Sequence, residues 1–314
     1  MSARPAVAGV YCAAFTAIDD HGAVDLGRTA AHARSLIAEG CDGVALLGTT
    51  GEANSLSQAE RRAVLEAAIA AGVPANRLLP GTSACAIGEA VELTRHARAC
   101  GVETVLLLPP FYYPDPTLAG LIDFYSRVID ATATDGLRVL LYHIPQMTGV
   151  PITAELIMAL LDRFPGVVVG VKDSGGDLDR MIALVDAFPD FAVLAGADHL
   201  LGPLLRAGGA GCITATSNLI APLLAELYAR IARGEAVEAT RALELHIGDT
   251  RSLFQRWPQI AALKAAHALI QGDPAWANVR PPLQPLDIIQ QAELRHAMRE
   301  QGLLTDQDLR ENIA

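Results

Sequence analysis

Short runs of β-branched and leucine residues alternate with amphipathic stretches between about residues 9 and 219. This alternation is typical of repeated βα units. Eight of the runs have the length and apolar character of buried strands, and a helical pattern follows each of them. We expect strands near residues 10–15, 43–47, 78–81, 104–108, 138–142, 167–172, 192–195 and 211–214.

Capping residues indicate where some of the intervening helices begin and end. Ser57 precedes a helical pattern that Gly72 and Pro74 terminate, and Thr153 precedes another that ends before Pro165. Serine and threonine favour the position before a helix because their hydroxyl accepts from a free backbone N–H.

Eight βα units predict an α/β fold, a closed (β/α)8 TIM barrel, over residues 1–233. After residue 233 no strand pattern follows, and residues 234–314 are expected to form a helical C-terminal extension with several prolines. The chain of 314 residues accommodates a barrel of roughly 250 residues and an extension. The alternative is an open doubly wound sheet, which usually has fewer strands and often carries a GxGxxG turn that this sequence lacks.

Charge and composition narrow the possible partners. The net charge of −11 repels nucleic-acid phosphates and anionic lipids, so neither nucleic acid nor a membrane surface is an expected partner. No apolar run reaches membrane-spanning length, and we expect no signal peptide. Five scattered cysteines show no metal-binding spacing, which favours a reduced, cytoplasmic protein.

Lysine is rare in this chain. Of 24 basic residues only Lys172 and Lys264 are lysines, and all the others are arginines. A lysine amine can lose its proton and form an imine, whereas an arginine cannot. Lys172 ends a predicted strand, which places it at the active-site face of a barrel and makes it a candidate nucleophile. The alternative is a solvated lysine or an ion-pair partner of Asp173.

Two other strand ends carry polar groups. The turn at residues 48–51 offers the hydroxyls of Thr49 and Thr50 and backbone N–H groups beside glycines, a possible carboxylate site, although it also suits an ordinary loop. Tyr142 ends another strand and is a candidate acid/base group or a core tyrosine. His143 points to the opposite face of that strand, so we interpret it as structural.

Five motifs in order along the chain resemble the family of dihydrodipicolinate synthase and N-acetylneuraminate lyase, which are pyruvate-dependent Schiff-base enzymes. The motifs are Gly-Thr-Thr-Gly-Glu at 48–52, Pro-Pro-Phe-Tyr-Tyr at 109–113, Tyr-His-Ile-Pro at 142–145, Gly-Val-Lys-Asp-Ser at 170–174, and Gly-Gly-Ala-Gly-Cys-Ile-Thr-Ala at 208–215, followed by Asn218. Together they span nearly the whole chain.

The resemblance implies a role for each matching residue. Lys172 would form the imine with pyruvate, and Tyr142 would act as acid/base. Thr49 and Thr50, in the loop that begins at Gly48, would hold the pyruvate carboxylate, and Thr49 would also relay protons. This chemistry requires neither a cofactor nor a metal.

The resemblance also implies an oligomer. Tyr112 matches a tyrosine that, in the synthases, reaches into the neighbouring subunit's site and completes a Tyr-Thr-Tyr relay. A tight homodimer, within a homotetramer, is therefore expected. Ile213 matches the residue beside pyruvate and would contribute shape and a backbone carbonyl.

The sequence departs from the synthases at Met147. Synthases carry an arginine shortly after the Tyr-x-x-Pro motif to bind the aldehyde's carboxylate, and methionine cannot replace it. The string at 172–177 is more similar to 4-hydroxy-2-oxoglutarate and 2-keto-3-deoxy sugar acid aldolases. Residues 146–150, with Arg256 and Trp257 of the extension, are candidates for shaping specificity.

The leading hypothesis is a class I aldolase or lyase that joins pyruvate to an aldehyde or cleaves the resulting 2-oxo acid. Alternatives are a dihydrodipicolinate synthase, a sugar-acid dehydratase with the same imine, and a non-catalytic 2-oxo acid sensor, which would tolerate loss of Lys172 or Tyr142. A metal-dependent aldolase or enolase-like barrel needs clustered ligands, and Asp198 with His199 is the nearest candidate in the sequence.

Overall fold

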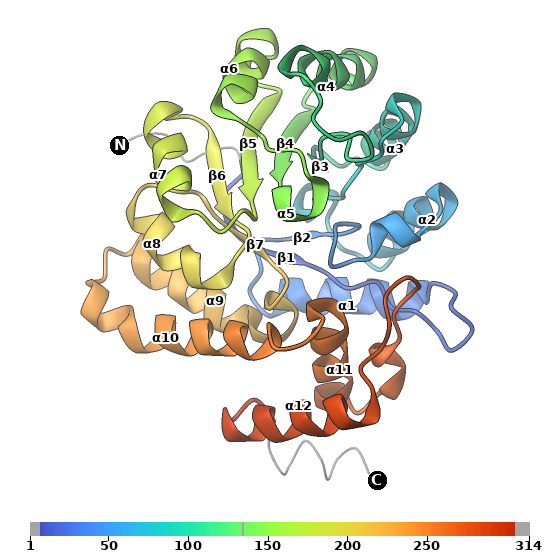
Figure 1. Cartoon of the computed structure of the whole chain (residues 1–314), viewed down its shortest axis with the longest axis vertical. Helices are drawn as coiled ribbons and strands as arrows, with labels where there is room; N and C mark the ends of the chain where they lie inside the picture. The colour runs from blue at the N-terminus through green and yellow to red at the C-terminus, as the bar shows by residue number, and fades with distance from the viewer. Residues whose placement is uncertain (1–6, 134, 305–314) are drawn as a thin grey trace.

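A computed structural model describes residues 7–133 and 135–304. Within these ranges, seven strands form one parallel sheet that curves into a barrel, and helices surround it (Figure 1). The strands are β1 Gly9–Ala13, β2 Gly43–Ala45, β3 Thr104–Leu107, β4 Arg138–His143, β5 Val168–Asp173, β6 Ala192–Ala195 and β7 Gly211–Thr214. They pair in the order β2-β1-β7-β6-β5-β4-β3. The predicted TIM-barrel fold is confirmed.

The eighth predicted strand, residues 78–81, does not form a regular strand. It nevertheless lies between β2 and β3. The Leu79 amide donates to the Val44 carbonyl at 2.9 Å on one side, and the Leu106 amide donates to the Pro80 carbonyl at 3.0 Å on the other. Proline has no N–H to donate, so this segment cannot continue a ladder on both sides. The prediction of eight regular strands was wrong by one, although this segment closes the ring.

β2 ends two residues earlier than the sequence predicts because the backbone turns sharply there. Leu47 has a φ of 59° and Glu52 a φ of 55°, so left-handed residues bracket the loop at 48–51. Gly81 allows this turn to approach closely, since a Cβ there would lie 2.2 Å from the Leu47 carbonyl oxygen. The loop is thereby held against the barrel end.

The helices around the barrel are α1 Leu26–Ala38, α2 Gln58–Ala70, α3 Ile87–Ala99, α4 Leu118–Thr132, α5 Pro145–Thr148, α6 Ala154–Arg163, α7 Leu178–Ala187, α8 Leu201–Arg206 and α9 Ser217–Ala232. The predicted caps are confirmed at two of them. Ser57 and Glu60 form a capping box at the start of α2, and Thr153 accepts from the Leu156 amide at the start of α6.

Up to residue 304, where the described part of the chain ends, three further α-helices follow the barrel: α10 Val237–Phe254, α11 Gln259–Gln271 and α12 Ile288–Glu300. In Figure 1, α10 runs beside α9, and α11 and α12 lie below α1. They share a hydrophobic core with the residues after β1, and this core includes Phe15, Phe254 of α10 and Met298 of α12. The boundary near residue 233 stays a prediction. No helix in the described ranges has the length and hydropathy needed to cross a membrane.

Candidate active site

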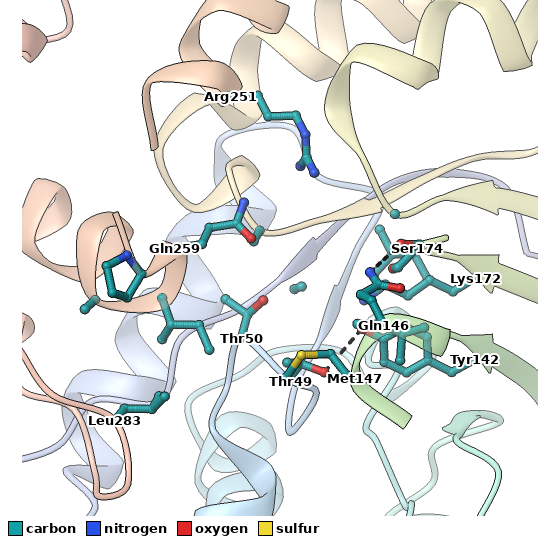
Figure 2. Close-up of a pocket in the computed structure, with 18 of the residues that line it drawn as sticks. Thr49, Thr50, Tyr142, Gln146, Met147, Lys172, Ser174, Arg251, Gln259 and Leu283 are labelled. Carbon is teal, nitrogen blue, oxygen red and sulfur yellow. Dashed lines mark hydrogen bonds between the residues drawn. The ribbon is translucent and has the colours of Figure 1, made fainter. Parts of the chain in front are cut away.

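A cavity of about 600 Å³ opens at the carboxyl ends of the strands, the face where barrel enzymes place their active sites (Figure 2). Strand ends supply its floor, and residues of α10, α11 and the segment before α12 supply part of its wall. Of the eight residues predicted to act in catalysis or substrate binding, six line this cavity: Thr49, Thr50, Tyr142, Met147, Lys172 and Ile213. Gln146, from the segment predicted to shape specificity, lines it as well.

Lys172 lies near the end of β5 and only 4% of its surface is exposed. The parallel pairing of β4 with β5 sets Lys172 opposite Tyr142. Its Nζ lies 4.2 Å from the centre of the Tyr142 ring. The predicted amine and the predicted acid/base group are therefore neighbours, and side chains that line the barrel mouth shield both from bulk water.

Tyr142 is tied to the loop after β2. Its hydroxyl lies 3.3 Å from the Thr49 hydroxyl. Burial alone would raise the pKa of Tyr142, but the Lys172 charge and hydrogen bonds from Thr49, Lys172 and Ser174 outweigh it, so the pKa is lowered from its usual value. A phenol with a lowered pKa, beside an amine and a hydroxyl, is suited to moving protons.

The loop that carries Thr49 and Thr50 is anchored from behind. The Thr16 hydroxyl donates to the Gly51 carbonyl at 2.7 Å, and the Glu52 carboxylate accepts from the Lys264 amine at 2.6 Å. Thr50 is buried and Thr49 half-buried at the cavity surface. The second lysine of the sequence thus supports the loop from outside the cavity, a role that its rarity alone did not reveal.

Two predicted site residues do not line the cavity. Gly48 lies behind Thr49, in a small separate pocket beside Arg61. Tyr112 follows β3, where 77% of its surface is exposed and its ring stacks edge-on against Tyr113 with centroids 5.3 Å apart. A place for Tyr112 in a neighbouring subunit's site stays a prediction. His143, interpreted as structural, accepts from the Ile152 amide through Nδ1.

Met147 lies at the cavity edge with 67% of its surface exposed. It belongs to the short α5, where the neighbouring Gln146 donates to the Ser174 carbonyl at 2.7 Å. This bond joins the wall that contains Met147 to the loop after Lys172. Met147, at the position where the resemblance to synthases implies an arginine, is therefore apolar and open to solvent.

Sequence reasoning missed three polar residues that line the cavity. They are Arg251 of α10, Gln259 of α11 and Gln284 of the segment before α12. The extension residues proposed for specificity, Arg256 and Trp257, stack on each other at 5.0 Å and lie outside the cavity lining, so that expectation was wrong. No local pattern marks Arg251, because its place depends on how α10 packs against the barrel.

Arg251 is held by Asp198, which follows β6 and is completely buried. Arg251 Nη1 donates to Asp198 Oδ2 at 3.3 Å. His199, the other half of the candidate metal pair, lines a separate surface pocket on α10. Within residues 7–133 and 135–304, no three His, Cys, Asp or Glu side chains are grouped as metal ligands.

Residues 6–301 match the dihydrodipicolinate synthetase family. An uncharacterized DapA-like lyase of Chloroflexus aurantiacus is 36% identical over 88% of this chain and 91% of its own length. A 4-hydroxy-tetrahydrodipicolinate synthase of Agrobacterium fabrum is 32% identical over 94% and 99%. Among solved structures, the prophage protein YagE of Escherichia coli K12, in complex with pyruvate, matches with a TM-score of 0.86 and 29% identity over 94% of this chain and 99% of that one.

Proposed function

The chain belongs to the dihydrodipicolinate synthetase family, whose members are class I pyruvate-dependent lyases, and on that premise we propose that Lys172 forms the Schiff base. One observation supports this most directly. The buried Lys172 amine, the Tyr142 ring at 4.2 Å and the Tyr142–Thr49 hydrogen bond meet in a single cavity. Nucleophile and proton carrier are thus within reach of one substrate carbon.

In the proposed reaction Lys172 first loses its proton, and the neutral amine attacks the C2 carbonyl of a 4-hydroxy-2-oxo acid. The Tyr142–Thr49 relay returns a proton to the C2 oxygen, which leaves as water and gives a protonated imine. The C4 hydroxyl then loses its proton, the C3–C4 bond breaks, and the electron pair moves into the imine to form an enamine. The aldehyde departs. Protonation of C3 and hydrolysis of the imine release pyruvate, and condensation is the reverse sequence.

The neighbouring residues take the supporting roles in this proposal. Tyr142 and Thr49 carry protons to and from the imine and the C4 oxygen, since their hydroxyls are hydrogen-bonded at 3.3 Å. Thr50 and the loop amides that follow Gly48 bind the carboxylate next to the carbonyl. Ile213 is fully buried in the cavity floor and gives the pyruvate methyl an apolar contact.

We also propose that the active unit is a homodimer, within a homotetramer. Tyr112 and Tyr113 form an exposed aromatic pair, and exposed aromatic clusters are typical of subunit contacts. In this arrangement the partner subunit's Tyr112 would extend the Tyr142–Thr49 relay. Sedimentation of the wild type and of Tyr112→Ala tests it, and a fully active monomer would contradict it.

The substrate class favoured by the site is a 4-hydroxy-2-oxo acid, such as 4-hydroxy-2-oxoglutarate or a 2-keto-3-deoxy sugar acid, rather than aspartate semialdehyde with pyruvate. Met147 carries the preference against the semialdehyde, because it offers no charge at the position where the resemblance to synthases places that aldehyde's carboxylate. A dehydratase that acts on a sugar acid through the same imine is the second candidate, since it would use the same lysine and tyrosine.

Borohydride reduction in the presence of pyruvate tests the central proposal. Peptide mapping should locate a reduced pyruvyl adduct on Lys172, and Lys172→Arg should abolish the adduct. Lys264→Arg is the matched control, because it replaces the second lysine and leaves the first. An adduct on Lys264, or none, would overturn the mechanism. Product analysis with each substrate class then separates aldolase, dehydratase and synthase.

A further inference from the structure

The wall of the cavity contributed by α10 and α11 is rich in hydrogen-bond donors. Figure 2 shows Arg251 directed into the cavity from the side opposite Thr49 and Tyr142, with Gln259 beside it. Neither residue belongs to the proposed imine machinery. Both come from the helices that follow the barrel, so this wall is built separately from the strand ends.

Donors on this wall lack acceptors within the described part of the chain. Arg251 Nε and Gln259 Nε2 are both buried without a hydrogen-bond partner. Only one terminal nitrogen of Arg251 is engaged, by Asp198 at 3.3 Å. These two nitrogens and Asp198 Oδ1, which is also unpaired, are shielded from the cavity surface. The donor left for a ligand is Arg251 Nη2, which makes no hydrogen bond within the described residues and is not among the buried atoms.

Asp198 fixes the orientation of Arg251 without competing for the cavity. It is completely buried and does not line the cavity, so it holds the guanidinium from behind. The Arg251 side chain is 15% exposed. A long side chain held in this way loses little further conformational freedom when it binds a ligand, which strengthens that contact.

We propose that Arg251 and Gln259 bind a carboxylate at the far end of the substrate, and that the substrate is therefore a 2-oxo acid with a second carboxylate. The assignment rests on the proposed function, which places the first carboxylate at Thr50 and the reacting carbonyl at Lys172. This receptor lies on the wall formed by α10 and α11 and not at Met147, the position where the resemblance to synthases implies an arginine.

Charge and hydrogen-bond pattern distinguish a carboxylate from the other groups that could stand at the far end of the substrate. A carboxylate only accepts hydrogen bonds and matches the planar guanidinium, whereas a sugar hydroxyl carries no charge for Arg251 to neutralise. A phosphate dianion would add two negative charges beside the buried Asp198, with a single arginine between them. A singly charged carboxylate leaves less repulsion.

Two substrates with the same carbon skeleton test the proposal. 4-Hydroxy-2-oxoglutarate ends in a carboxylate, and 4,5-dihydroxy-2-oxopentanoate ends in a hydroxymethyl group. Arg251→Met should lower kcat/KM for the diacid about 10- to 100-fold, mainly through KM, and change the hydroxymethyl substrate less than about 3-fold. Gln259→Leu should show the same selectivity with a smaller loss.

Matched variants separate binding from folding. Asp198→Asn with Arg251→Met removes both charges together, so no buried charge is left unpaired, and the double variant should keep the selective loss. Arg256→Met replaces an arginine that stacks on Trp257 outside the cavity and should behave as the wild type. An equal loss for both substrates, or a phosphorylated analogue preferred through Arg251, would overturn the carboxylate assignment.

The proposed function and this inference fail separately. Borohydride trapping with pyruvate should be unchanged in Arg251→Met, because the reacting carbonyl lies at Lys172. Calorimetric titration with 2-oxoglutarate measures how tightly the far carboxylate binds, because this compound has no C4 hydroxyl and is not cleaved. If pyruvate is trapped on Lys172 but the affinity for 2-oxoglutarate is unchanged in Arg251→Met, this inference alone is contradicted. If the affinity for 2-oxoglutarate depends on Arg251 but no pyruvate is trapped, the Schiff-base mechanism is contradicted and the carboxylate site is supported.

Discussion

The Nζ of Lys264 lies 2.6 Å from Oε1 of Glu52, and both side chains are completely buried. The amine also donates to the Thr16 carbonyl at 3.0 Å, and the second Glu52 oxygen accepts from the Arg280 amide at 2.7 Å. Burial lowers the pKa of Lys264, and the Glu52 charge opposes that shift. The pair connects α11 to the loop that presents Thr50.

Breaking this pair on one side should be costly. Lys264→Met or Glu52→Gln alone should reduce the free energy of unfolding by about 3–5 kcal/mol, because each leaves a polar or charged partner buried without its counterpart. The double variant should be less destabilised than the sum of the two singles. Urea denaturation at neutral pH measures all three.

The exposed pair of Arg62 and Glu92 provides the control. Its side chains are 39% and 59% exposed at a separation of 3.3 Å. Exposed ion pairs contribute about 0–1 kcal/mol, so Glu92→Gln should change stability little. If Lys264→Met were as mild as Glu92→Gln, the buried pair would have no anchoring role.

Two neutral histidines should make the protein sensitive to acid. His32 and His267 lie with ring centroids 4.7 Å apart in the core between α1 and α11, and His32 Nε2 is 2.8 Å from Asn218 Oδ1. Burial lowers the pKa of His32 to about 4, and burial with the neighbouring His32 lowers that of His267 to about 3. Both rings are therefore neutral in the folded protein at pH 7.

The unfolded chain takes up protons at these histidines below pH 6.5, whereas the folded chain does not. Above pH 6.5 both rings are neutral in the folded and the unfolded chain, and stability is at its full value. As the pH falls from 6.5 toward 4, the free energy of unfolding decreases by about 1.4 kcal/mol per pH unit for each ring. Urea titrations between pH 7.5 and 4.5 should show this slope. His267→Phe should reduce the slope, whereas His296→Gln, at a 75% exposed position, should not. A stability independent of pH across this interval would contradict the prediction.

Most of the barrel was predictable because its strands are local apolar runs, whose pattern needs no knowledge of distant contacts. Lys172 and Tyr142 were found for the same reason, since an inward-facing residue at the carboxyl end of a barrel strand lies at the barrel mouth. The segment at 78–81 was mispredicted because Pro80 breaks a ladder that its apolar neighbours otherwise favour.

Arg251 and Gln259 escaped prediction because their position is set by tertiary packing. Helix α10 is amphipathic, and from the sequence a polar residue on such a helix is expected to face solvent. Only the packing of α10 beside α9 and the burial of Asp198 direct Arg251 toward the cavity. Similarly, nothing in the sequence shows that Lys264 meets Glu52, which is 212 positions away.

Gly196 is expected to be essential for the shape of the cavity. A Cβ at this position would lie 2.0 Å from the Ser174 hydroxyl and 2.8 Å from its Cα, and both residues line the cavity. Gly196→Ala should displace Ser174 and lower kcat/KM at least about 10-fold, because small displacements of a site are costly in rate. Steady-state kinetics on the diacid measures the effect.

The control for this change is Gly88→Ala. Gly88 lies in α3, where an added Cβ meets no atom within 4 Å. Alanine there should stabilise the protein by about 0.5–1 kcal/mol and leave the kinetics unchanged. Unchanged kinetics in Gly196→Ala as well would show that the Ser174 loop adjusts freely.

Tyr142→Phe should separate imine formation from proton transfer. The phenylalanine ring keeps the contact with the Lys172 amine and loses only the hydroxyl that bonds Thr49. We expect borohydride to trap pyruvate on Lys172 still, while C–C bond cleavage falls about 10²- to 10⁴-fold, the usual contribution of a positioned acid/base group. A variant with full cleavage activity would exclude Tyr142 from the proton path.

The pH profile gives an independent test of that role. The neutral phenol is the proton donor, so activity should decline as the pH rises through the pKa of Tyr142. That pKa is lowered because the Lys172 charge and hydrogen bonds from Thr49 and Ser174 outweigh the opposing effect of burial, so the decline should be centred below pH 10. Thr49→Val removes one of these bonds and should move the alkaline limb of kcat/KM to higher pH, in addition to any loss of rate. Because Tyr142→Phe has no phenol to ionise, its residual activity should lack this limb, and a limb that persists unchanged would assign it to another group.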